Sequence, residues 1–116
     1  MPRLSRAEDF PRAMLQYAQE ATTLAQGRQR SDLDTDRMFE LSLAHLIQNV
    51  GTAAESRHWN RHVWNRRLGS QRDALYKMRN RIVHETDPMN RDELWQTATE
   101  TLPAIMPQLE EIVAGL

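Results

Sequence analysis

The sequence contains no cysteine, which excludes disulfide bridges and cysteine-ligated metal sites. No uninterrupted apolar run exceeds three residues, so no segment is apolar enough to form a transmembrane helix. The first six residues also lack the apolar stretch of a signal peptide. We therefore expect a cytoplasmic protein that has no contact with a membrane.

Glycine and proline are scarce, at four and five residues among 116, and the alternation typical of β-strands is absent. Apolar residues recur instead at helical spacing along most of the chain. There is no internal repeat and no linker. The sequence therefore predicts one domain over residues 1–116, an all-α, antiparallel, up-and-down bundle of four to five helices.

Capping residues place the first two helices. The first runs from about residue 6 or 10 to residue 26, and Pro11 favours a start near Asp9 because proline is tolerated only in the first turn. Gly27 is its natural end. The second starts at the Asp34–Asp36 cluster and runs to about residue 56. The expected buried stripes of the two helices are Phe10, Met14, Tyr17, Ala21 and Leu24, and Phe39, Leu43, Leu46, Val50 and Ala53.

A third helix is predicted from about Ser70 to residue 85 or 86, and a last helical stretch from Asn90 to the C-terminus. Asn90 and Glu93 have the spacing of a capping pair. Pro103 either begins a separate fifth helix or kinks one long helix. The apolar face of the third helix is expected to hold Leu75, Met78 and Ile82.

Positive charge is concentrated in residues 56–84, which hold eight basic residues and one acidic residue, whereas the rest of the chain has a net charge of −8. Such a segment either attracts phosphates and acidic partners or pairs with the acidic remainder. In the first case the phosphate-binding arginines are expected to be Arg61, Arg66, Arg67, Arg72 and Arg81.

Aromatic and histidine side chains lie within this basic segment. Trp59 and Trp64 either stack on nucleic-acid bases or anchor the connection in the core. His58 and His62 have the spacing of metal ligands on a helix. No third ligand accompanies them and the neighbouring arginines repel a cation, so we expect neither a metal site nor a cofactor.

The residues best suited to chemistry are Arg79, Asn80, Arg81 and His84. A guanidinium binds phosphate and stabilises the charge that develops during its transesterification, and a histidine moves protons near neutral pH. These groups suit RNA cleavage without a metal. On one ideal helix Asn80 and His84 share a face, whereas Arg79 and His84 do not, so two copies are needed to complete a site. The alternative is that the arginines are surface charges and His84 caps the helix.

This segment resembles the Arg-x4-His signature of HEPN domains, and in particular the Arg-Asn-x3-His-x-Tyr motif of HepT-type toxins. Residues 49–54 resemble a Gly-Glu-Ala-Ala stretch of that family, residues 92–95 a stretch that ends in tryptophan, and residues 102–103 a Leu-Pro turn. The resemblance implies a ribonuclease in which Arg79 binds phosphate, His84 transfers protons and Asn80 positions the substrate. It also implies a homodimer and a minimal nucleotidyltransferase as antitoxin.

Two positions depart from the family pattern. Thr86 stands where the family has the tyrosine that receives a nucleotide from the antitoxin, and Thr52 stands where it has glutamate. These departures keep a second function open, that of an inactive subunit which binds the nucleotidyltransferase and nucleotide or RNA without cleavage. His45, Asn49, Thr52 and Thr86 are expected to line the groove beside the motif.

Overall fold

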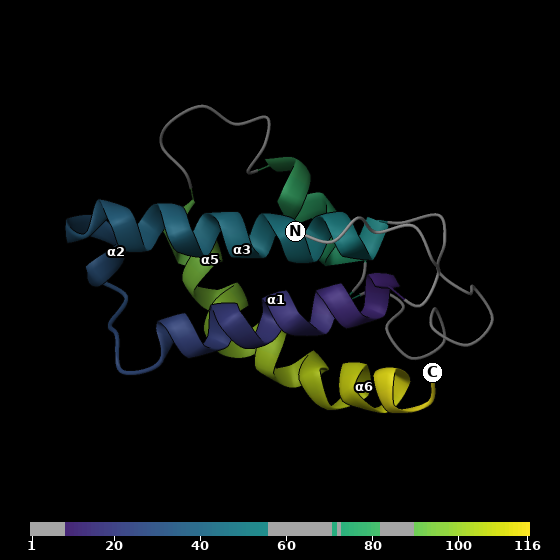
Figure 1. The fold of residues 1–116 in the computed structure, drawn as a ribbon. Helices are drawn as coiled ribbons and strands as arrows, with labels where there is room; N and C mark the ends of the chain where they lie inside the picture. The colour runs from purple at the N-terminus through teal and green to yellow at the C-terminus, as the bar shows by residue number, and fades with distance from the viewer. Residues whose placement is uncertain (1–8, 56–70, 72, 82–89) are drawn as a thin grey trace.

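The computed structural model describes residues 9–55, 71, 73–81 and 90–116, and every regular element among them is helical (Figure 1). The helices are α1 (Asp9–Ala25), α2 (Asp32–Thr35), α3 (Arg37–Glu55), an unlabelled helix over residues 73–81, α5 (Arg91–Gln96), the π-helix η1 (Thr97–Thr101) and α6 (Leu102–Ala114). The predicted all-α bundle is confirmed.

The N-terminal helix ends where its stop signal predicts. The structure describes this helix from Asp9 on, and Pro11 lies buried in the first described turn. It ends at Ala25, and Gly27 follows with a φ of +74°, a left-handed conformation that glycine adopts without steric cost.

The second predicted helix starts at the acidic cluster, as expected. A separate four-residue helix that the sequence pattern did not predict, α2, comes directly before it and includes Asp34 and Thr35 of the cluster. Asp36 then caps α3, because its Oδ1 accepts a hydrogen bond from the backbone N–H of Phe39 at 3.1 Å. Leu46, expected in the buried stripe, is only partly buried, whereas Ile47 is fully buried.

The C-terminal stretch runs from α5 through η1 into α6 without a gap (Figure 1). The Asn90 side chain accepts a hydrogen bond from the Glu93 N–H at 3.0 Å, which confirms the predicted cap. Pro103 was expected either to begin a separate helix or to kink one long helix. The structure has the second arrangement, one continuous helical run with a widened turn. Proline donates no backbone hydrogen bond and crowds the preceding turn, and that turn is the π-helix.

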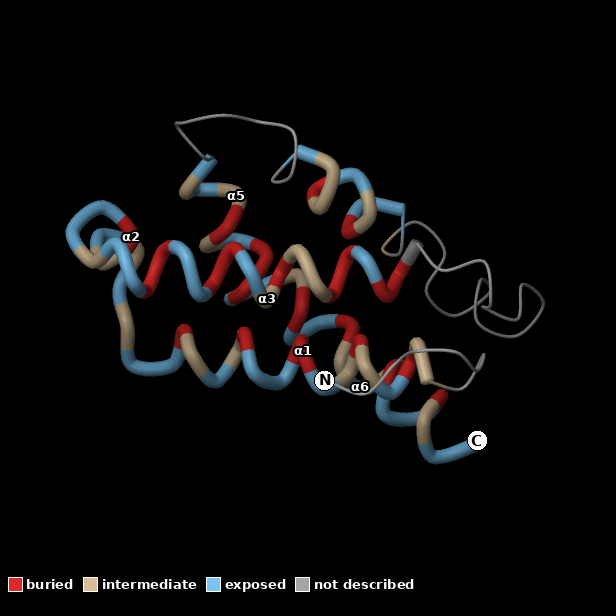
Figure 2. Tube along the Cα trace, turned by 45° about the horizontal axis from the view of Figure 1, so that its top comes forward, coloured by how far each residue is buried: buried red, intermediate tan, exposed pale blue. Residues whose placement is uncertain are grey.

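The buried residues lie on the inward faces of the helices, and the core is between α1, α3 and α6 (Figure 2). One carboxylate is also buried. Glu40, with 1% of its surface exposed, accepts hydrogen bonds from Arg37 at 2.6 Å and from Arg91 of α5. Burial raises the pKa of Glu40, but the hydrogen bonds from Arg91 and Arg37 outweigh that effect and leave the pKa below its ordinary value.

Candidate active site

The helix over residues 73–81 carries the first part of the motif and lies against the C-terminal half of α3. Leu75 and Met78 are buried, as predicted, and the Thr97 hydroxyl of η1 contacts the Met78 sulfur at 3.0 Å. This face fixes the rotation of the helix. Arg79 and Asn80 are consequently partly buried, and Arg81 is exposed.

Gly51 of α3 permits a very close approach of the two helices. A β-carbon at Gly51 would lie 2.3 Å from Cβ of Arg79 and 2.7 Å from the carbonyl oxygen of Leu75. Both distances are far below van der Waals contact, so only glycine fits here. The base of the Arg79 side chain therefore rests directly on the α3 backbone.

The guanidinium of Arg79 is held by two neutral oxygens. Its Nε donates to the hydroxyl of Thr52 at 3.2 Å, and one terminal nitrogen donates to Oδ1 of Asn80 at 3.0 Å. No hydrogen bond within the described part of the chain uses the other terminal nitrogen. Since a guanidinium has five N–H groups, the outer edge of the fork keeps donors for the two oxygens of a phosphate.

Arg79 also differs from most other arginines of the described residues in having no ion-pair partner there. Five other arginines of the described ranges pair with carboxylates, namely Arg28, Arg30, Arg37, Arg81 and Arg91. Within the same ranges no carboxylate lies within ion-pair distance of Arg79. An anion that reaches this guanidinium would thus displace no carboxylate of the described chain.

Arg81, predicted to bind the RNA backbone, forms an ion pair with Glu93 of α5. The two side chains lie beside a cavity of about 180 Å³ between the 73–81 helix, α5 and η1. Nothing in the sequence pattern singled out Glu93 as a partner, because the pair joins residues 12 positions apart on different helices. A phosphate at Arg81 has to compete with this carboxylate.

Six of the predicted site residues lie outside the described part of the chain. They are His84, Thr86, Arg61, Arg66, Arg67 and Arg72. The two candidate metal ligands, His58 and His62, and the tryptophans Trp59 and Trp64 also lie there. Among the residues that are described, no group of three or more His, Cys, Asp or Glu side chains could hold a metal ion.

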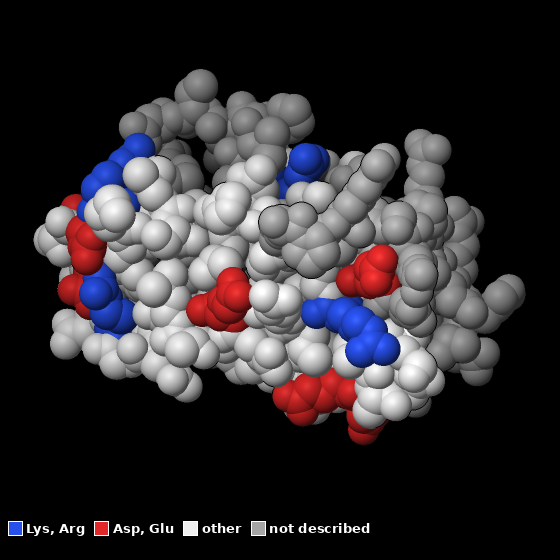
Figure 3. Space-filling view, viewed as in Figure 1, with Lys and Arg blue, Asp and Glu red and all other residues white. Residues whose placement is uncertain are grey.

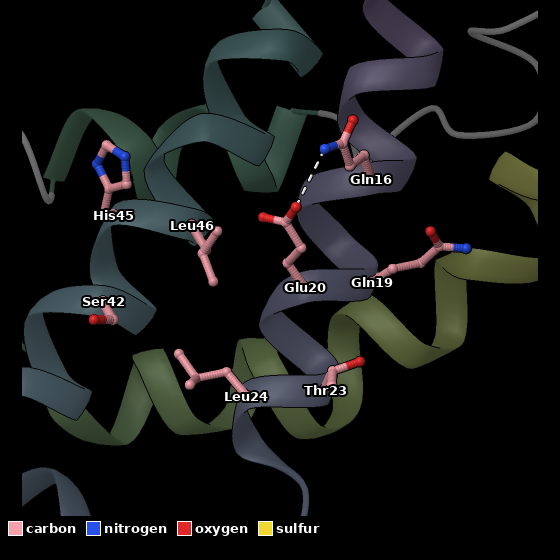
Figure 4. A pocket seen from close by; sticks show the side chains of 8 residues that line it. All are labelled: Gln16, Gln19, Glu20, Thr23, Leu24, Ser42, His45 and Leu46. Carbon is pink, nitrogen blue, oxygen red and sulfur yellow. Dashed lines mark hydrogen bonds between the residues drawn. The ribbon is translucent and has the colours of Figure 1, made fainter. Parts of the chain in front are cut away.

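His45 and Asn49 occupy the solvent side of α3, and their side chains meet at 3.2 Å. His45 lines a groove of about 650 Å³ between α1 and α3 (Figure 4). In this groove Gln16 donates to Glu20 at 3.2 Å, while Leu24 and Leu46 supply apolar surface. The described lining of this groove includes neither Arg79 nor Thr52. Of the three expected groove residues that the structure describes, Thr52 is the one that is bonded to the motif arginine.

Charges of both signs gather at the end of the molecule near α2, whereas the middle of the same face carries few (Figure 3). The paired arginines Arg28 and Arg30 account for part of this cluster. Arg28 is bonded to Asp36 at 2.7 Å, and Arg30 is bonded to Asp92 at 2.6 Å.

Among the described helices, none has the length and apolar character that a membrane span requires.

Comparison with models of known protein families identifies the family of this chain. The model described as "Ribonuclease HepT-like" matches residues 14–112. The chain belongs to the HepT-like ribonuclease family. No curated protein and no solved structure matches it. The match covers α3, the 73–81 helix and most of α6, and so includes the close crossing at Gly51 of this HepT-like protein.

Proposed function

We propose that this HepT-like protein is a metal-independent endoribonuclease of the HEPN type. In our proposal it is a single-domain, cytoplasmic homodimer, and the toxin of a toxin–antitoxin pair. One observation carries the activity. Among the described residues, Arg79 has no ion-pair partner and the outer edge of its guanidinium makes no hydrogen bond. Arg79 also lies beside Asn80 and five residues before His84.

The proposed reaction is transesterification. His84 removes the proton of a ribose 2′-hydroxyl, and the 2′-oxygen forms a bond to the adjacent phosphorus. The bond from phosphorus to the 5′-oxygen breaks, and that oxygen leaves with a proton from a second acid, for which the His84 of the other protomer is the candidate. The products are a 2′,3′-cyclic phosphate and a 5′-hydroxyl.

Arg79 would hold two phosphate oxygens with its outer edge and stabilise the charge that develops on them. Asn80 Oδ1 already orients that arginine, so its amide N–H groups remain to position the phosphate or the hydroxyl. Arg61, Arg66, Arg67, Arg72 and Arg81 would contact the RNA backbone. The nucleotidyltransferase would restrain the enzyme by covering the site.

The test is cleavage of an end-labelled single-stranded RNA by the purified protein. We expect products that end in 2′,3′-cyclic phosphate in the presence of EDTA, and a loss of about 10²–10⁴ in rate for Arg79→Ala and for His84→Ala. Light scattering should give about twice the 13.5 kDa of one chain. Cleavage that stops with EDTA, or a strict monomer that cleaves, contradicts the proposal.

The second candidate function is an inactive subunit that binds the nucleotidyltransferase together with nucleotide or RNA. The threonines at positions 52 and 86 favour it, because both replace residues that the family pattern carries. RNA binding without cleavage, unchanged in Arg79→Lys, would support this function over the first.

A further inference from the structure

The Thr52 hydroxyl is set as an acceptor toward Arg79. Its single proton is donated to the backbone carbonyl of Gln48, one turn earlier on α3, at 3.0 Å. A hydroxyl has one proton and two lone pairs, so the same oxygen faces Nε of Arg79 at 3.2 Å as an acceptor only. The α3 backbone thus occupies the hydroxyl proton and leaves a lone pair of the oxygen for the Nε–H donor of Arg79.

The same turn of α3 therefore holds Arg79 at both ends. Gly51 lets the Cβ and Cγ atoms rest on the helix backbone, and Thr52 holds the start of the guanidinium plane. An arginine that is held in this way loses less side-chain entropy when it binds an anion.

The acceptor that holds Arg79 is a neutral hydroxyl. Where an arginine of this protein is held by a carboxylate, as Arg81 is by Glu93, its charge is partly cancelled and its donors are occupied. A hydroxyl orients the guanidinium and leaves its full positive charge for a ligand. We infer that Thr52 is a positioning residue, which aims the Arg79 guanidinium at a phosphate without neutralising it.

This inference rests on the proposed ribonuclease function for its kinetic consequence, but not for its structural one. We expect Thr52→Val, which keeps the side-chain shape and removes the acceptor, to lower kcat/KM for RNA roughly tenfold. Thr52→Ser should restore cleavage.

The matched control is Thr99→Val. The Thr99 hydroxyl donates to the Trp95 carbonyl at 2.7 Å, which is the same bond to the preceding turn, and no arginine of the described chain is bonded to it. This variant should cleave RNA as the unsubstituted protein does. Thr52→Ala, checked by circular dichroism, serves as a second variant in case Thr52→Val does not fold.

A second readout does not need catalysis. The Nε–H signal of Arg79 in a ¹⁵N spectrum, assigned by its loss in Arg79→Lys, should shift on titration with inorganic phosphate. Thr52→Val should weaken that titration several-fold and Thr52→Ser should preserve it. If the protein cleaves no RNA but Thr52 governs the titration, the proposed function fails and the positioning role holds. If Thr52→Val matches the unsubstituted protein in both measurements, the positioning role is wrong.

Discussion

Gly51 and Arg79 are packed backbone against side chain, with room for no β-carbon between them: one added at Gly51 would lie 2.3 Å from Cβ of Arg79. This crossing places the arginine on α3 beside Thr52, although the two residues are 27 positions apart in the sequence. Gly51 is therefore a part of the candidate site, because its lack of a side chain permits the close contact with Arg79.

Gly51→Ala should destabilise the protein by about 1–3 kcal/mol, because the added methyl group has to push the two helices apart. At an unobstructed helical position the same substitution would stabilise the protein by about 1 kcal/mol. The sign of the change in stability therefore shows whether the close contact is present. Thermal unfolding measures the stability, and RNA cleavage should fall together with it.

The control for this prediction is Gly115→Ala. A β-carbon there would meet its nearest atoms at 3.6 Å, which is ordinary contact. We expect its effect on stability to stay within about 0.5 kcal/mol and its effect on cleavage to be negligible. A Gly51→Ala protein as stable and active as Gly115→Ala would show that the helices do not cross as the structure has them.

Local signals predicted two of the helix ends that the structure describes. The caps at Asn90 and the glycine stop at Gly27 depend only on neighbouring residues, and both were predicted correctly. Helix α2 was missed because four residues are too short to show a periodic pattern. The π-helix was missed too, although Pro103 marks the place where the regular hydrogen-bond pattern has to change.

Contacts between distant segments were beyond the sequence pattern. Arg79, Asn80 and Thr52 were each selected as site residues, but their hydrogen bonds depend on how two helices cross. A glycine followed by small residues in α3 was the available signal for that crossing. The pairing of Arg81 with Glu93 had no such signal, because charges on the surface of a helix have many possible partners.

Glu93→Gln should strengthen RNA binding, because it releases Arg81 from its ion pair. The pair is partly exposed, so we expect the Kd at low salt to fall by a factor of about two to five. The slope of log Kd against log salt concentration should steepen by about one phosphate contact. Glu110→Gln, on the exposed side of α6, changes the net charge equally and is the control. Equal effects of the two substitutions would assign the gain to net charge alone.

Acid should destabilise the protein through Glu40, whose pKa the hydrogen bonds from Arg91 and Arg37 hold below its ordinary value against the opposing effect of burial. A carboxylate with a lowered pKa in the folded state stabilises that state above its unfolded pKa of about 4.3 and loses this contribution as the pH falls through the folded pKa. Urea unfolding should thus show lower stability at pH 3 than at pH 7.

Glu40→Gln isolates this contribution. At pH 7 it should cost about 1–3 kcal/mol, because the arginine partners lose a buried counter-charge. The difference between the two proteins should shrink as the pH falls below about 4, where Glu40 of the unsubstituted protein takes up a proton. A constant difference across that range would show that Glu40 acts through packing and not through its charge.

Control of the enzyme by covalent addition of a nucleotide should fail in this protein. A threonine hydroxyl is shorter and far less acidic than a phenol, whose pKa is about 10, so Thr86 is a poor acceptor for an enzyme that modifies tyrosine.

Tyr17 is 8% exposed on the inner face of α1, and burial raises its pKa. Tyr76, partly buried and one turn before Arg79, is the remaining phenol. Intact mass spectrometry after co-expression with a minimal nucleotidyltransferase, the proposed partner, should therefore show an unmodified chain. Thr86→Tyr, which places a phenol two residues after His84, should gain the mass of a nucleotide and lose RNA cleavage. An added nucleotide on the unsubstituted protein, mapped to Thr86 or removed by Tyr76→Phe, would contradict restraint by steric binding alone.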